Sequence, residues 1–119
     1  MLPARNRITR GAEFRLVFRT GKRSRGAFLQ LSITETNSGE PPRVGFVLSR
    51  KVGGAVTRNR IRRQLRAIVF SMLHELSAGQ LIAIRVLPSA ASASFTELSA
   101  EVARQLARFQ RQPLPDNGV

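Results

Sequence analysis

The spacing of apolar residues predicts three helices. An apolar triplet at i, i+3 and i+4 predicts a short helix that ends before Gly21: Phe14, Val17 and Phe18. A longer helix is predicted over residues 55–76, with one apolar stripe that must pack on the rest of the protein: Ile61, Leu65, Ile68 and Met72. The last helix opens with the capping box SFTE, residues 94–97. Its stripe comprises Phe95, Leu98, Val102, Leu106 and Phe109.

Three other segments have the pattern of β-strands. Residues 27–34 alternate between two faces, and residues 43–49 have the composition of a second strand. Residues 81–87, LIAIRVL, form a nearly continuous apolar run, which suits a strand with both faces covered. The segment TNSGEPP, residues 36–42, is a loop by composition, so the strands on either side of it are expected to pair antiparallel.

The predicted order is therefore α-β-β-α-β-α, which indicates an α+β fold, an α/β sandwich. Helices would pack against a mostly antiparallel or mixed sheet, with a crossover around the long helix. The chain has 119 residues, 42% of them hydrophobic, so we expect a single folded domain over residues 1–119. The basic arm of residues 1–8 and the tail of residues 112–119 are expected to be loose.

Composition limits where the protein acts. The chain contains no cysteine, which excludes disulfides and thiolate metal sites. No apolar run approaches the roughly 20 residues of a membrane span, and the basic N-terminus lacks the apolar stretch of a signal peptide. We therefore expect a cytoplasmic protein with no membrane partner.

The charge of the chain indicates a polyanionic partner. Twenty Lys and Arg residues stand against seven Asp and Glu, a formal net charge of +13. Residues 1–25 hold eight of the basic residues and residues 50–66 hold seven, with Glu13 as the single acid in both stretches. Nucleic acid is the first candidate, and we expect the two basic stretches to share one binding face.

Residues 55–66, AVTRNRIRRQLR, place five arginines on the predicted long helix without an acidic residue. Arg58, Arg62 and Arg66 lie at i, i+4 and i+8 and form one line, called here the arginine row. Arg60 and Arg63 widen the row, and Asn59 is expected to contact phosphate or base. Arginine suits bidentate phosphate contacts. The glycine pair before the helix permits a close approach of an anion to the free N–H groups of its first turn.

Catalysis by protein groups has little support in the sequence. There is one histidine, and the seven acids are scattered without the paired spacing that two-metal chemistry needs. We expect no catalytic residue, no organic cofactor and no small-molecule substrate. If a reaction takes place beside this chain, another molecule supplies the reacting groups.

The segment RKVGGAVTRNRIRRQLR, residues 50–66, closely resembles the arginine–asparagine–arginine signature of the bacterial ribonuclease P protein subunit. The likeness extends to Phe14 and Phe18 before Gly21, to RVGF at residues 43–46, and to the opening of the last helix. It covers nearly all of residues 5–111 in the order of the family. Many members carry an aromatic residue at the position of Leu31.

The resemblance implies a function and a fold. Members bind a large catalytic RNA, and the complex removes the 5′ leader of precursor tRNA in a magnesium-dependent hydrolysis whose active site lies in the RNA. The Mg²⁺ ions would be held mainly by that RNA. The family fold is an α/β sandwich, ribosomal protein S5 domain 2-like, with a left-handed βαβ crossover.

The resemblance also implies roles for individual residues. The RNA-facing positions would be Arg50, Lys51, Arg58, Asn59, Arg60, Arg62, Arg63 and Arg66. Phe14 and Phe18 match aromatic positions of the cleft that holds the single-stranded leader.

Two other readings remain open from the residues. A non-catalytic RNA-binding module, such as a ribosomal protein, would share the basic helix but leave precursor tRNA untouched. A DNA-binding regulator would read the major groove through the same helix, but such helices mix Asn, Gln, Ser and Thr among their basic residues. No short helix-turn-helix spacing precedes this helix either.

Overall fold

The structure is a computed structural model and describes residues 2–111, with the side chains of residues 2–110. Its helices are α1 (Gly11–Thr20), α2 (Ala55–Ser71) and α3 (Phe95–Arg111). Its strands are β1 (Lys22–Arg25), β2 (Leu29–Glu35), β3 (Arg43–Val47) and β4 (Gln80–Val86). Short 3₁₀ turns, η1 (Ala4–Asn6), η2 (Arg50–Val52), η3 (Leu73–Glu75) and η4 (Pro88–Ser92), lie between them. The fold is mixed α+β, as predicted.

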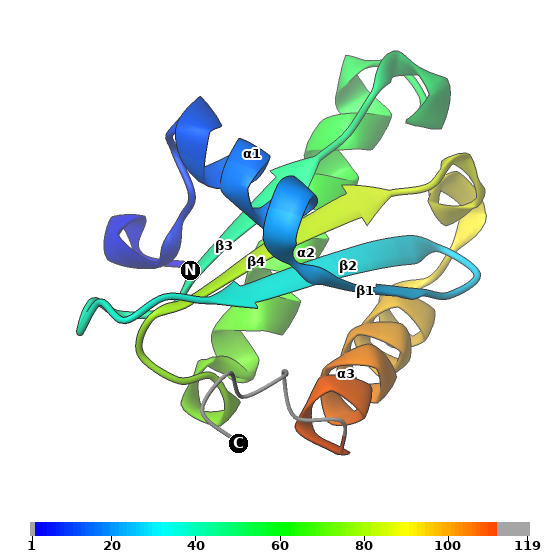
Figure 1. The fold of residues 1–119 in the computed structure, drawn as a ribbon. Helices are drawn as coiled ribbons and strands as arrows, with labels where there is room; N and C mark the ends of the chain where they lie inside the picture. Colours follow the sequence, from blue (N-terminus) through cyan, green and yellow to red (C-terminus); the bar gives the residue numbers. More distant parts are fainter. Residues whose placement is uncertain (1, 112–119) are drawn as a thin grey trace.

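The four strands form one sheet in the order β1-β2-β4-β3. β2 pairs antiparallel with both β1 and β4, whereas β3 pairs parallel with β4 through the α2 crossover. Seen from the side of α1 with β3 and β4 pointing upward, β4 lies to the right of β3 and α2 lies behind the sheet (Figure 1). The crossover is therefore left-handed, although the general rule for βαβ units favours the right-handed form.

Two predictions about the strands are wrong. β3 does not pair with β2, because β4 lies between them in the sheet. The order α-β-β-α-β-α also omits β1, since the sequence KRSR has no apolar alternation to reveal it. β1 is held by its pairing with β2 at the edge of the sheet, where basic side chains are compatible with solvent.

Helices cover both faces of the sheet, with α1 on one face and α2 and α3 on the other (Figure 1). Alternate residues of β2 and β4, such as Leu31 and Ile84, point to the α2 and α3 side and form the main core. Between them, Leu81 and Ala83 point to α1 and form a smaller cluster with Ile8 and Val17. This double burial explains the continuous apolar run of β4.

The N-terminal residues pack on the sheet, so the prediction of a loose arm over residues 1–8 is wrong for residues 2–8. Leu2 is fully buried, and Asn6 Nδ2 donates a hydrogen bond to the Pro42 carbonyl at 2.8 Å. The Ile8 N–H donates to the Val44 carbonyl at 3.0 Å, which continues the sheet beyond β3. Burial of Leu2 and Ile8 outweighs the basic composition of the arm. The predicted loose tail, residues 112–119, lies outside the described residues.

The predicted capping box of α3 is confirmed. The Ser94 N–H donates to Glu97 Oε1 at 2.9 Å, and the Glu97 N–H donates to Ser94 Oγ at 3.1 Å. α2 is shorter than predicted, because the chain turns into η3 after Ser71. Within residues 2–111 no helix is long and apolar enough to cross a membrane.

Candidate nucleic-acid interface

The arginine row lies where α2 meets the protein surface. Ile61 and Leu65 of α2 are fully buried against the sheet. Arg58, Arg62 and Arg66 flank this buried stripe and are half-buried, whereas Arg60 and Arg63 are exposed. The stems of the row therefore pack on the protein while the guanidinium groups reach the surface. Successive members are four residues apart, about 6 Å along the helix axis.

These arginines have no acidic partner in the described part of the chain. Arg43, His74 and Arg104 supply the cationic groups of the salt bridges there, and all three lie outside α2. Arg60 Nη2 instead donates to the Ala91 carbonyl at 2.9 Å, and Arg62 Nη1 donates to Asn59 Oδ1 at 3.1 Å. Asn59 thus orients an arginine of the row. The positive charge of α2 is left for a ligand to neutralise.

Arg7, which no local pattern of the sequence indicated, joins the row at one end. Arg7 is held by a hydrogen bond from its Nε to the Leu2 carbonyl at 2.8 Å, and its backbone bridges to Val44. Burial, followed by the charges of Arg7 and Arg62, lowers the pKa of the Arg66 guanidinium below its usual value. Three neighbouring cations favour an anion at this place. The signal in the sequence was the charge of the arm, but its position depends on tertiary packing.

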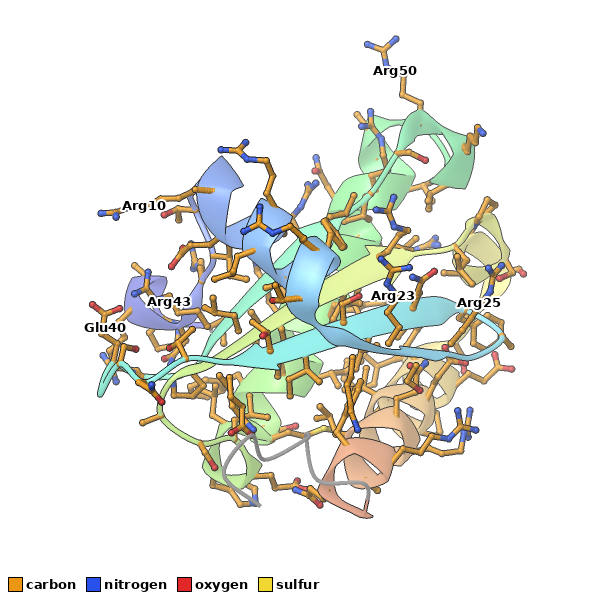
Figure 2. All side chains as sticks on the ribbon, viewed as in Figure 1. Arg10, Arg23, Arg25, Glu40, Arg43 and Arg50 are labelled. Atoms are coloured by element: carbon orange, nitrogen blue, oxygen red, sulfur yellow. The ribbon has the colours of Figure 1, made fainter. Side chains whose placement is uncertain are left out.

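The other predicted RNA-facing residues surround the start of α2. Arg50 and Lys51 are exposed on η2, and Arg50 extends outward from it (Figure 2). The N-terminal cap of α2 is Gly54, which supplies no side-chain hydrogen bond, so no side chain of the cap residue satisfies the first N–H groups. Val56, in the first turn, is 85% exposed. The eight predicted residues therefore lie on α2 and on the turn that precedes it.

The two predicted aromatic residues lie on the opposite face of the sheet. Phe14 and Phe18 of α1 stack with ring centroids 6.3 Å apart, and both are half-buried. Phe14 lies directly over Gly45, where an added Cβ would be 2.3 Å from the ring. The guanidinium carbon of Arg85 lies 4.9 Å from the centre of the Phe18 ring. This aromatic pair with a cation beside it can hold a stacked base and its phosphate.

The strands extend this polar surface across the sheet. Arg25 of β1 pairs with Gln30 of β2, which in turn pairs with Arg85 of β4. The three side chains therefore share the face of the sheet that α1 covers. Arg23 is on the same face and donates from Nη2 to the Phe18 carbonyl at 2.9 Å. The charge and apolar patterns of the sequence did not indicate Arg23, Arg25 and Gln30. Arg85 had one signal, because it interrupts an apolar run.

Leu31 takes no part in this surface. It is fully buried on the α2 and α3 side of the sheet, so the residue at its position does not contact a ligand on the α1 side. The residues of β2 that face α1 are Gln30, Ser32 and Thr34.

Apart from Arg7, the two basic stretches do not share one face, contrary to the prediction. β1 forms one edge of the sheet, while β3, which leads into η2 and α2, forms the other. Arg10 and Arg25 extend to opposite sides of the molecule, and Arg50 extends to a third (Figure 2). The positive charge therefore surrounds much of the protein, and in the first basic stretch Arg7 is the residue placed beside the arginine row.

The acidic residues that the structure describes do not form a metal site. No group of three or more His, Asp or Glu side chains in the described part of the chain could hold an ion. Glu13 is engaged with Arg43 at 2.9 Å, and the Glu101 carboxylate accepts the Leu29 N–H at 2.6 Å. The described side chains therefore do not fit a magnesium site carried by the protein alone.

Comparison with known proteins identifies relatives over almost the whole chain. The family described as Ribonuclease P matches residues 2–110. The ribonuclease P protein component of Acidothermus cellulolyticus is 47% identical over 110 residues, which cover 92% of each chain. That of Beutenbergia cavernae is 47% identical over 102 residues, 86% of each chain.

Solved structures agree in fold. A mutant Staphylococcus aureus RNase P protein, described as defective in mRNA degradation, superposes with a TM-score of 0.82 at 20% identity over 88% of each chain. The RNase P protein of Thermotoga maritima gives 0.77 at 22% identity, covering 87% of this chain and 97% of its own. The arginine-rich α2, the aromatic α1 and these matches lead to one conclusion: this chain belongs to the ribonuclease P protein family.

Proposed function

We propose that this chain is the protein subunit of ribonuclease P, that α2 binds the catalytic RNA, and that the α1 side of the sheet binds the 5′ leader of precursor tRNA. The observation that carries the proposal is the arginine row, whose charge has no acidic partner in the described residues. Phosphates of a folded RNA supply the negative charge that the protein lacks. The complex acts in the cytoplasm.

The residues divide into three roles. Arg58, Arg62 and Arg66 form the centre of the RNA contact, with Asn59 fixing the direction of Arg62. The exposed cations around them extend the contact: Arg50, Lys51, Arg60 and Arg63. Phe14 and Phe18 stack on bases of the leader.

The reaction itself belongs to the RNA in this proposal. The chain provides cations and aromatic surfaces, which bind and orient RNA but do not activate water. Magnesium ions would be coordinated by RNA phosphates, since the described carboxylates do not form a cage for them. The protein lowers the repulsion between the RNA and its substrate, so its effect is greatest when magnesium is scarce.

The test compares the unmodified protein with the double variant Arg58→Ala, Arg62→Ala in holoenzyme assembled on the cognate RNA. Removing two phosphate contacts should weaken assembly and make the slope of log K against log salt less negative by roughly 1.8. Cleavage of precursor tRNA should fall at low magnesium and recover at high magnesium. Arg10→Ala, which removes one charge at an exposed site away from α2, is the control.

Unchanged assembly and cleavage in the double variant would refute the assignment of α2. A ribosomal RNA-binding module, by contrast, would sediment with ribosomes and leave the maturation of tRNA 5′ ends unaltered.

A further inference from the structure

The arginine row leads into an exposed aromatic ring at its C-terminal end. Phe70 lies four residues after Arg66, the same spacing that separates Arg66 from Arg62. It is in the last turn of α2 and is 50% exposed, whereas its neighbour Val69 is buried in the main core. A single exposed ring is ordinary by itself. This one, however, directly follows a line of cations that have no acidic partner within residues 2–110.

The helix places two arginines close to this ring. Arg66 precedes Phe70 by about 6 Å along the helix axis and Arg63 by about 10 Å, and both lie within about 40° of it around the axis. Long side chains of a helix lean toward its N-terminus, so the ring covers the preceding turn, which carries Arg66 and Ala67. The Ala67 side chain is a single methyl group, so it leaves room for a flat group beside the ring.

The charge of α2 around the ring is positive. α2 contains no acidic residue, and Glu75, the next acid along the chain, has its Oε2 3.9 Å from His74 Nε2. Arg63 is exposed and Arg66 is half-buried. A ligand that matches this surface combines a flat apolar part for the ring with negative charge for the arginines, and a nucleotide has both. A second copy of the chain fits poorly, because it would bring two arginine rows together.

We propose that Phe70 stacks on an unpaired base of the catalytic RNA, and that Arg63 and Arg66 contact the phosphates next to that base. The inference rests on the proposed function, in which α2 binds this RNA. The arginine row by itself attracts any RNA backbone, since phosphate contacts carry no sequence information. A stacked base, by contrast, requires a nucleotide outside a double helix. Phe70 therefore fixes the position of α2 along the RNA.

The experiment measures assembly of the full chain with the cognate catalytic RNA over a series of salt concentrations. Phe70→Ala should weaken assembly about five- to tenfold, the lower part of the range for one stacked base, because half of the ring is already covered by protein. The slope of log K against log salt should stay unchanged, since stacking releases no counterions. Arg63→Ala, which removes a phosphate contact, should instead make the slope less negative by about 0.9.

Two conservative variants separate stacking from apolar packing. Phe70→Tyr keeps a flat ring and should keep most of the affinity. Phe70→Leu keeps apolar area but has no ring face, so it should lose nearly as much affinity as Phe70→Ala. Acylation of RNA 2′-hydroxyl groups, which reports nucleotides that move freely, then locates the base. One unpaired nucleotide protected by the unmodified chain and by Phe70→Tyr should regain its reactivity with Phe70→Ala.

Phe95→Ala is the matched control, because Phe95 has a similar exposure, 47%, but lies at the start of α3. It should leave assembly unchanged. Unchanged assembly with Phe70→Ala, an equal loss with Phe95→Ala, or full affinity with Phe70→Leu would overturn the inference. A fall in the sedimenting mass of the isolated protein on Phe70→Ala would also overturn it, because the ring would then join two copies of the chain. If the unmodified chain does not assemble with the RNA, the proposed function itself fails.

Discussion

Glu101 offers a direct test of how the structure holds the β1–β2 hairpin in place. Its side chain is 1% exposed on α3. Glu101 Oε2 accepts the Leu29 N–H at 2.6 Å and the Phe28 N–H at 3.1 Å, and it also accepts from Gln105 Nε2 at 3.1 Å. The carboxylate therefore anchors the start of β2 to α3, next to the turn from β1.

Replacing Glu101 by Ala leaves two backbone N–H groups without an acceptor. Each unsatisfied buried donor costs about 1–3 kcal/mol, and the Phe28 N–H is only partly buried. Removing a buried carboxylate recovers part of this cost, so we expect the free energy of unfolding to fall by about 3 kcal/mol. Glu101→Gln can keep an oxygen at the position of Oε2, and its loss should be about 1 kcal/mol. The side chain of Gln105 keeps a second acceptor, the Leu29 carbonyl at 3.0 Å.

The assay is urea unfolding of the isolated protein, followed by circular dichroism at constant salt. Arg104→Ala is the matched control. Arg104 Nη2 lies 3.7 Å from Glu101 Oε1, but the Arg104 side chain is 55% exposed. A surface pair of this kind contributes at most about 1 kcal/mol. If Glu101→Ala loses less than about 1 kcal/mol, or if it loses no more than Glu101→Gln, then the two N–H groups find other acceptors and the reasoning fails.

Three further predictions concern packing and charge. Gly45→Ala should lower the free energy of unfolding in urea by about 1–3 kcal/mol, because the added Cβ would force the Phe14 ring to move. The same displacement should weaken leader binding, and an unchanged leader affinity would contradict this. Leu65→Ala should cost about 2–5 kcal/mol in the same assay, since Leu65 is fully buried; a smaller loss would mean that α2 repacks. Arg7→Ala should make the salt slope for catalytic RNA less negative by about 0.9 and bring the pKa of Arg66 closer to its usual value. An unchanged slope would place Arg7 outside the RNA contact.

Features that depend on neighbours along the chain were predictable from the sequence. The apolar stripe of α2 is set by helical spacing, so Ile61, Leu65 and Ile68 were correctly expected in the core. The capping box of α3 is likewise local, because its two hydrogen bonds join residues three apart. The basic character of α2 also follows from the sequence, since helical geometry alone puts the arginine row on one line.

Features that depend on residues far apart in the chain were decided only by the tertiary structure. The partner of β3 is β4, because the α2 crossover inserts β4 into the middle of the sheet, and no local pattern encodes that choice. β1, with no apolar alternation, exists because β2 offers it an edge to pair with. Arg7 reaches Arg66, and Arg85 reaches Phe18, across many residues of chain. The spacing of hydrophobic residues thus determined most of the elements and their buried sides. The positions of the charged groups, by contrast, depend on how the whole sheet packs.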